Sequence, residues 1–168
     1  DVSVQLQVHS TRRTGWSVAN GQIDLAIIGG QLPSDLENLL HIVPYATDEL
    51  ALVLPVNHPL SIKKELSKED LYKLNFVTLD SQSTTRKVVD KLLKDSGLDI
   101  QRLKIEMELN SLEAIKNAVQ SGLGASFLPV VSIERELEGG SIHKPLVADL
   151  EVKRELKLIT NPSRYTSR

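Results

Sequence analysis

Residues 9–30 read HSTRRTGWSVANGQIDLAIIGG, and this stretch decides the class of fold. A hydroxyl at Ser10 is a common helix start, and Gly21 suits the end of a helix over residues 12–20. Residues 23–28 then run apolar up to two glycines, which is typical of a buried strand. The stretch therefore predicts a helix, a glycine stop and a strand, the repeating unit of an α/β protein.

Residues 1–8, directly before that helix, alternate apolar and polar side chains and predict another strand. Two strands joined by a crossover helix pair in parallel with a right-handed connection, so their carboxyl ends should meet at one sheet edge. Because the alternation starts with the first residues, we expect a further segment upstream.

The same order of elements continues along the chain. Residues 119–122 and 124–128 repeat the helix end, glycine and strand of residues 18–28. The other predicted strands are 40–43, 49–55, 76–79, 103–109 and 152–159, and the predicted helices begin at Ser67, Ser83, Ser111 and Pro129. Ser67 to Asp70 resembles a capping box, and the helices after Ser83 and Ser111 each carry an apolar stripe: Val88, Val89, Leu92 and Leu93 in the first, and Leu112, Ile115, Ala118 and Val119 in the second. Extended chain over 49–55 and 152–159 predicts two crossings between two lobes. The first lobe would hold residues 1–47 and 152–168, and the second residues 48–151.

The composition limits the class of function. The 168 residues include 20 basic and 22 acidic side chains, a net charge of −2, so we expect no broad surface for direct DNA contact. The chain has no cysteine, which excludes disulfides and thiolate chemistry. It contains no secretory leader and no apolar run near the roughly 20 residues that span a bilayer. We therefore expect a cytoplasmic protein with no membrane contact.

The sequence shows no set of catalytic or metal-binding residues. His9, His41, His58 and His143 lack the spacing of a metal site. The acidic residues form no catalytic pair, and no nucleophile elbow or phosphate-binding glycine loop occurs. We expect no enzyme activity, no metal and no cofactor.

Residues 81–86, SQSTTR, place three hydroxyls and Arg86 at a helix start directly after a predicted strand. Free backbone N–H groups and the positive end of the helix dipole attract carboxylate or phosphate there. Simple capping by Ser83, with Arg86 in solvent, explains the pattern about as well. Ser10-Thr11-Arg12-Arg13 and Asn110-Ser111 are similar polar helix starts, for which capping or solvent exposure is the more common role.

Four segments together resemble the regulatory domain of LysR-type transcriptional regulators. They are 20–27 (NGQIDLAI), 48–60 (DELALVLP through HPL), 83–86 (STTR) and 113–129 (EAIK through GLGASFLP). The resemblance covers essentially the whole chain and implies two Rossmann-like lobes joined by a two-strand hinge, as in type II periplasmic binding proteins. In that family a winged helix-turn-helix, a linker helix and the first strand and helix of lobe one come earlier. The resemblance therefore implies that lobe one is truncated here, with a last helix expected beyond residue 168.

Within the family, residues 10–17 and 108–116 look most like the carbon-fixation regulators of cyanobacteria and plastids, the RbcR, CbbR and NdhR group. The resemblance implies a small anionic effector between the lobes, such as 2-oxoglutarate, 2-phosphoglycolate or a sugar phosphate. It also implies homodimers or tetramers that bind DNA only through the missing domain, in the cytoplasm or plastid stroma. The effector contacts that it implies are Ser10, Thr11, Ile28, Gly29, Ser83, Thr84, Thr85, Arg86, Asn110, Phe127 and Leu128.

Two other functions fit the same fold, because a fold does not determine a function. A solute-binding protein of a transport system is the main alternative, and a secretory leader upstream would favour it. An enzyme on the same two lobes would need a base or nucleophile that the sequence does not provide.

Overall fold

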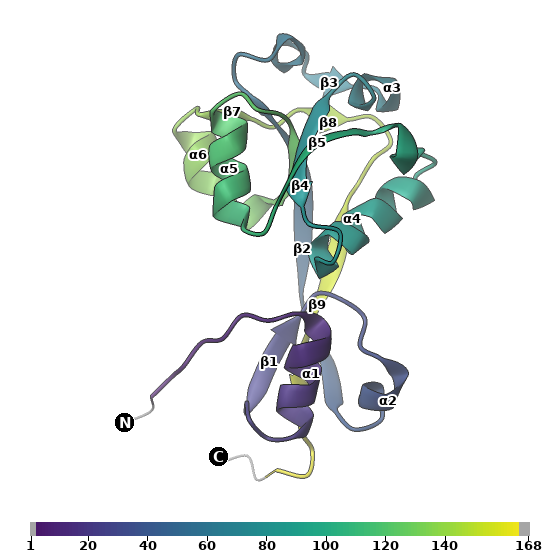
Figure 1. Ribbon diagram of the computed structural model, residues 1–168, viewed down its shortest axis with the longest axis vertical. Helices are drawn as coiled ribbons and strands as arrows, with labels where there is room; N and C mark the ends of the chain where they lie inside the picture. The colour runs from purple at the N-terminus through teal and green to yellow at the C-terminus, as the bar shows by residue number, and fades with distance from the viewer. Residues whose placement is uncertain (1–2, 165–168) are drawn as a thin grey trace. The chain divides into compact units, whose positions relative to one another are not determined.

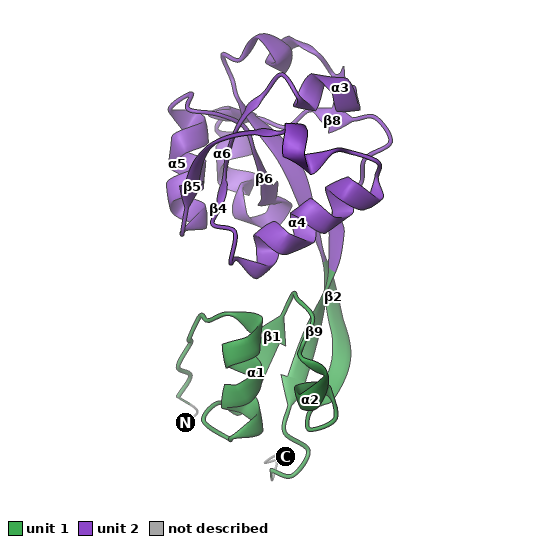
Figure 2. Cartoon of the chain, turned by 45° about the vertical axis from the view of Figure 1, so that its right-hand side comes forward, with its two compact units in different colours: residues 1–47, 155–168 green, residues 48–154 purple. Residues whose placement is uncertain are grey.

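A computed structural model describes residues 3–164 of the chain. The chain forms two compact units, drawn in green and purple in Figure 2: Asp1–Thr47 with Glu155–Arg168, and Asp48–Arg154. It passes from one unit to the other within two strands, β2 (His41–Pro55) and β9 (Lys153–Thr160). β9 confirms the strand predicted over residues 152–159, and β2 joins two predicted strands into one.

The first unit contains a sheet with the strand order β1–β9–β2 and two helices (Figure 1). Its elements are α1 (Thr11–Ala19), β1 (Leu25–Ile28) and α2 (Ser34–Glu37). A small core joins them, made of Val18, Ile28, Leu32, Leu36, Leu40 and Ile159. Gly15 allows α1 to approach this core, because a Cβ built there would lie 2.7 Å from Leu32 Cδ2. Gly21 follows α1 with φ +70°, as its predicted stop requires.

The strand predicted over residues 1–8 is wrong for the part that the structure describes. Residues 3–10 form no strand, and the side chains of Val4, Leu6 and Val8 are 84–89 % exposed. The parallel pairing predicted for this segment is also wrong, because β1 pairs antiparallel with β9, Leu25 opposite Thr160. Alternation alone does not make a strand, since a strand also needs a partner for its backbone groups.

The second unit is built on a mixed sheet. β4 (Asn75–Leu79) and β5 (Lys104–Leu109) pair in parallel, and β6 (Ser126–Pro129) pairs antiparallel with β2. A parallel bridge between Phe76 and Ala125 connects β4 to β6. β7 (Ile142–His143) pairs with the end of β2, and β3 (Glu65–Leu66) pairs with β8 (Leu146–Val147). The strands predicted for this region therefore form.

Two helices cover opposite faces of β4 (Figure 1). Val89 and Leu93 of α4 (Thr84–Asp95) share a hydrophobic cluster with Phe76. Ile115, Ala118 and Val119 of α5 (Leu112–Gln120) pack in a second cluster with Val77. Because Phe76 and Val77 are neighbours on a strand, their side chains point to opposite faces. The predicted apolar stripes of both helices are confirmed.

The remaining helices are short. They are α3 (Lys68–Leu71), α6 (Glu134–Glu138) and the 3-10 turns Pro59–Ile62, Ile100–Arg102 and Val130–Ser132. α3 has the predicted capping box, in which Ser67 and Asp70 bond each other's backbone N–H. The helix predicted to start at Pro129 is wrong, because Pro129 ends β6 opposite Leu50 and α6 begins only at Glu134. A proline is tolerated at a strand end, where its missing N–H costs no ladder bond.

Candidate functional site

The start of α4 is held by a short network of bonds. Ser83 caps the helix, its Oγ accepting from the Arg86 N–H at 3.4 Å. The Ser83 N–H donates to the carbonyl oxygen of Asp80 at 3.0 Å, and the Gln82 N–H donates to Asp80 Oδ1 at 2.9 Å. Capping by Ser83, one of the two interpretations of the sequence, is therefore present. It leaves the first backbone N–H groups of a 12-residue helix pointing out of its start.

Asn110 belongs to the same edge of the sheet. β4 and β5 run in parallel and end in register, with Leu79 opposite Leu109. The Asp80 N–H donates to the Leu109 carbonyl at 3.0 Å, so the loops after both strands start side by side. Asn110 is exposed in the second of these loops. The structure thus brings Asn110 to the edge that carries the α4 start, as expected for parallel strands.

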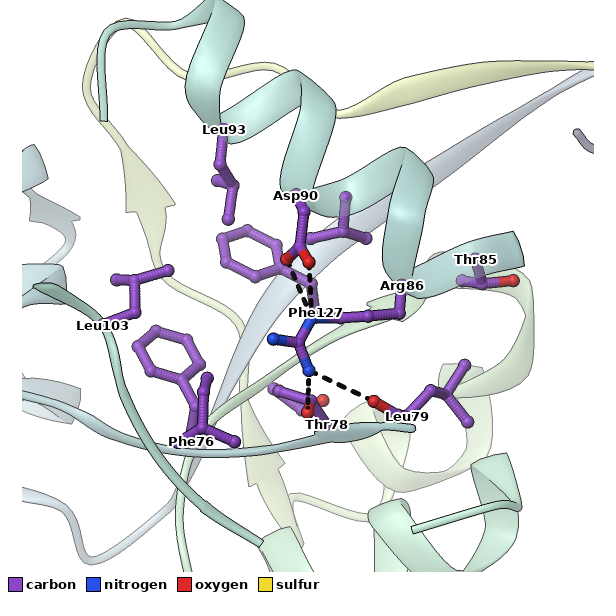
Figure 3. A pocket seen from close by; sticks show the side chains of 12 residues that line it. Phe76, Thr78, Leu79, Thr85, Arg86, Asp90, Leu93, Leu103 and Phe127 are labelled. Atoms are coloured by element: carbon purple, nitrogen blue, oxygen red, sulfur yellow. Dashed lines mark hydrogen bonds and ion pairs between the residues drawn. The ribbon is translucent and has the colours of Figure 1, made fainter. Parts of the chain in front are cut away.

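Arg86 does not extend from the α4 start into solvent. Its Nε donates to both carboxylate oxygens of Asp90 at 2.8 and 2.9 Å, and its Nη1 contacts the Thr78 hydroxyl and the Leu79 carbonyl (Figure 3). Glu108 Oε1 lies 3.5 Å from the same Nη1. The side chain is only 15 % exposed. Nearby carboxylates therefore already neutralise the charge of Arg86, and its contact with an external anion stays a prediction.

A pocket lies beneath α4, between the helix and the strands β4, β5 and β6 (Figure 3). It has an empty volume of about 410 Å³, including open solvent. The rings of Phe76 and Phe127 stack there with centroids 6.2 Å apart, and Arg86 and Asp90 also line it. Phe127 therefore faces this pocket within one unit. Leu128, the next residue, is fully buried in the cluster under α5, so its side chain faces the opposite side of the sheet.

The candidate residues of the first unit lie around α1 and the end of β1. Ser10 caps α1, accepting from the Arg13 N–H at 3.5 Å, and Thr11 is 9 % exposed. Ile28 is 5 % exposed and packs in the core, so only its backbone and that of Gly29 could reach a ligand. The effector contacts of this unit stay predictions.

One cation at the α4 start was missed by the sequence analysis. Arg154 Nη1 donates to the Thr85 hydroxyl at 2.8 Å, while its Nε donates to Asp48 Oδ2 at 2.7 Å. The Asp48 side chain is 6 % exposed and that of Arg154 is 15 % exposed. Arg154 is 69 positions from Thr85 and 106 from Asp48 in the sequence, so no local spacing could reveal these contacts.

No group of three His, Asp or Glu side chains within residues 3–164 is arranged to hold a metal ion. Across that same range, none of the helices combines the length and apolar character that crossing a membrane requires.

Comparison with known proteins shows the family. A family model described as the LysR substrate binding domain matches residues 1–168. A probable RuBisCO transcriptional regulator of Synechocystis is 61 % identical over 168 residues, covering 100 % of this chain and 49 % of the relative. A regulator of the same name from Porphyra purpurea is 59 % identical over 167 residues, covering 99 % and 53 %. The chain thus spans about half the length of these relatives.

Solved structures show the same fold. The regulatory domain of Synechocystis CcmR, in complex with 2-PG, matches with a TM-score of 0.81 and 23 % identity, covering 98 % of this chain and 76 % of that one. The effector-binding domain of QuiR with shikimate matches with a TM-score of 0.76 and 21 % identity, covering 95 % and 72 %. The α/β fold resembling type II periplasmic binding proteins is confirmed, and the transport protein and the enzyme are not favoured. The chain belongs to the LysR substrate-binding domain family, as an effector-binding domain.

Proposed function

We propose that this domain senses a small anionic metabolite of carbon metabolism and thereby controls transcription of carbon-fixation genes. The high identity to RuBisCO transcriptional regulators supports the process. The main structural support for an anionic ligand is the hydroxyl-rich start of α4, which lies at the edge of the β4–β5 pair. 2-Phosphoglycolate is the first candidate, since the CcmR domain binds 2-PG on the same fold. 2-Oxoglutarate and sugar phosphates are the others.

In this proposal the ligand meets the second unit at Ser83, Thr84, Thr85 and Asn110. The backbone N–H groups and hydroxyls of the first α4 turn would donate to its charged oxygens. DNA binding and homo-oligomer formation would belong to a longer polypeptide that acts in the cytoplasm or plastid stroma. Arg86 would support the site from beneath without contacting the ligand.

Calorimetric titration with 2-phosphoglycolate, 2-oxoglutarate and ribulose bisphosphate tests the proposal, with glucose as the uncharged control. We expect at least one anion to bind and glucose not to bind. If none of the three anions binds, the proposed ligand class is wrong.

Replacing Thr84 by Val should weaken binding of the anion by about tenfold or more, because one hydrogen bond to a charged group contributes about 1.5–3 kcal/mol. Val keeps the branched shape, so the fold should not change. Ser96→Ala removes a hydroxyl at the opposite end of the same helix and is the matched control. Equal affinities of both variants and the wild type would remove Thr84 from the site.

Replacing Arg86 by Leu should lower the free energy of unfolding by about 1–2 kcal/mol, because the partly buried Asp90 loses its partner. Anion affinity should change by less than about twofold, or about 0.4 kcal/mol in binding free energy, because Arg86 does not contact the ligand in this proposal. Urea denaturation and calorimetry measure the two effects, and Lys87→Ala at the exposed neighbouring position is the control. A large loss of affinity at unchanged stability would return Arg86 to the ligand contacts.

A further inference from the structure

Asp48 and Arg154 are the first and last residues of the second unit, so they mark the two points where the chain enters and leaves it. Nε and Nη2 of Arg154 both contact Asp48 Oδ2, at 2.7 and 2.6 Å. Both side chains are largely sheltered from solvent. Breaking such a sheltered pair would leave a buried charge without a partner, so we expect the two side chains to stay in contact. The ion pair therefore fastens β2 to β9 at the crossings.

Arg154 also reaches the first turn of α4. Its Nη1 donates to the Thr85 hydroxyl oxygen at 2.8 Å. A hydroxyl has two acceptor lone pairs and one proton to donate. Since Arg154 occupies a lone pair, the Thr85 proton remains for another acceptor at the helix start. One guanidinium thus joins both crossing strands to the hydroxyl of a proposed effector contact.

We propose that Arg154 is a positioning residue, acting through Thr85, that couples an anion at the α4 start to the two crossing strands. The inference rests on the proposed function. An anion that accepts the Thr85 proton draws the guanidinium toward itself, in competition with Asp48. Because coupling between two equilibria is reciprocal, a weaker hold by Asp48 must strengthen anion binding, and a bound anion must weaken the hold by Asp48. Anion binding at the α4 start thereby changes the ion pair that joins β2 to β9 at the crossings.

This coupling predicts opposite effects for the two members of one ion pair. Arg154→Gln removes the charge that supports the anion and should weaken binding of 2-phosphoglycolate by about tenfold, within the usual range of coupling energies. Asp48→Asn keeps an acceptor but removes the competing charge, so it should strengthen binding by about threefold. Arg154→Lys keeps the charge but loses the planar guanidinium with its several N–H donors, so its affinity for the anion should lie between those of the wild type and Arg154→Gln. General damage to the fold would weaken binding in every variant.

Calorimetric titration of the 168-residue chain with 2-phosphoglycolate, and separately with inorganic phosphate, measures these affinities. Lys153→Gln is the matched control, because it removes an equal charge from the neighbouring residue, whose ammonium contacts Glu151. Urea denaturation checks that each variant folds. A combined Thr85→Val, Arg154→Gln variant should bind no more weakly than the weaker single variant, since both remove one interaction.

The outcomes separate the two proposals. If wild type binds none of the anions, the proposed function fails and the coupling fails with it. If wild type binds but Asp48→Asn and Arg154→Gln change affinity in the same direction or not at all, the coupling alone is overturned. The coupling is also overturned if Lys153→Gln weakens anion binding as much as Arg154→Gln does. It is overturned as well if the losses of binding free energy in Thr85→Val and Arg154→Gln add up in the combined variant.

Discussion

Truncation of Phe76 to Ala is expected to lower the free energy of unfolding by about 3–4 kcal/mol, the usual cost of emptying a buried aromatic site. Phe76 is 2 % exposed and stacks on Phe127. Its strand position faces Ile105 of β5 and Ala125, the residue just before β6, so the lost ring leaves a cavity between these strands and α4. The existing pocket beneath α4 would grow into that cavity.

Urea denaturation measures the change in the free energy of unfolding. Leu146→Ala is the control, because Leu146 is 67 % exposed and its truncation should cost less than about 0.5 kcal/mol. A loss below about 1 kcal/mol for Phe76→Ala would mean that α4 collapses onto the strand and fills the space.

Replacing Lys116 by Met is expected to lower the free energy of unfolding at neutral pH by about 3 kcal/mol, the lower end of the range for a broken buried ion pair. The Lys116 side chain is 9 % exposed, and its Nζ lies 2.8 Å from Glu113 and 2.9 Å from Glu136. It also donates to the Ser132 carbonyl at 3.1 Å, so it ties α5 to α6 and the turn before it. Met fills similar space but leaves the sheltered Glu136 carboxylate without this partner.

The difference in the free energy of unfolding between Lys116→Met and the wild type should become smaller in acid. The hydrogen bond from Lys116 holds the pKa of Glu136 below its usual value in the folded chain. Stability from this contact is therefore fully present above the usual pKa of glutamate, about 4.3, and is lost as pH falls through the lower folded value. Denaturation between pH 7 and pH 3 measures the convergence of variant and wild type. Lys91→Met, which removes an exposed pair with Asp95, should cost less than about 0.5 kcal/mol throughout.

The sequence predicted those features that depend on neighbouring residues. The caps at Ser83 and Ser111, the capping box at Ser67 and the apolar stripes of α4 and α5 all depend on spacings of three or four residues. These predictions are confirmed.

Other features depend on contacts that spacing does not encode. Arg86 lies at a helix start, where a solvent-exposed side chain and one turned inward have the same sequence pattern. Asp90, one turn later, and Thr78 on β4 determine its direction. The link from Arg154 to Asp48 and Thr85 depends on three segments far apart in the chain. Such contacts arise from the packing of whole elements.

The 15 residues of β2 belong to both units, and this limits how the chain can change in length. Leu52 and Leu54 pack in the cluster under α4, whereas Val53 packs in the cluster under α5. Deleting one residue upstream in the strand would exchange these faces, because side chains alternate along a strand. Insertions and deletions should therefore accumulate in loops such as residues 56–64, while β2 keeps a constant length during evolution.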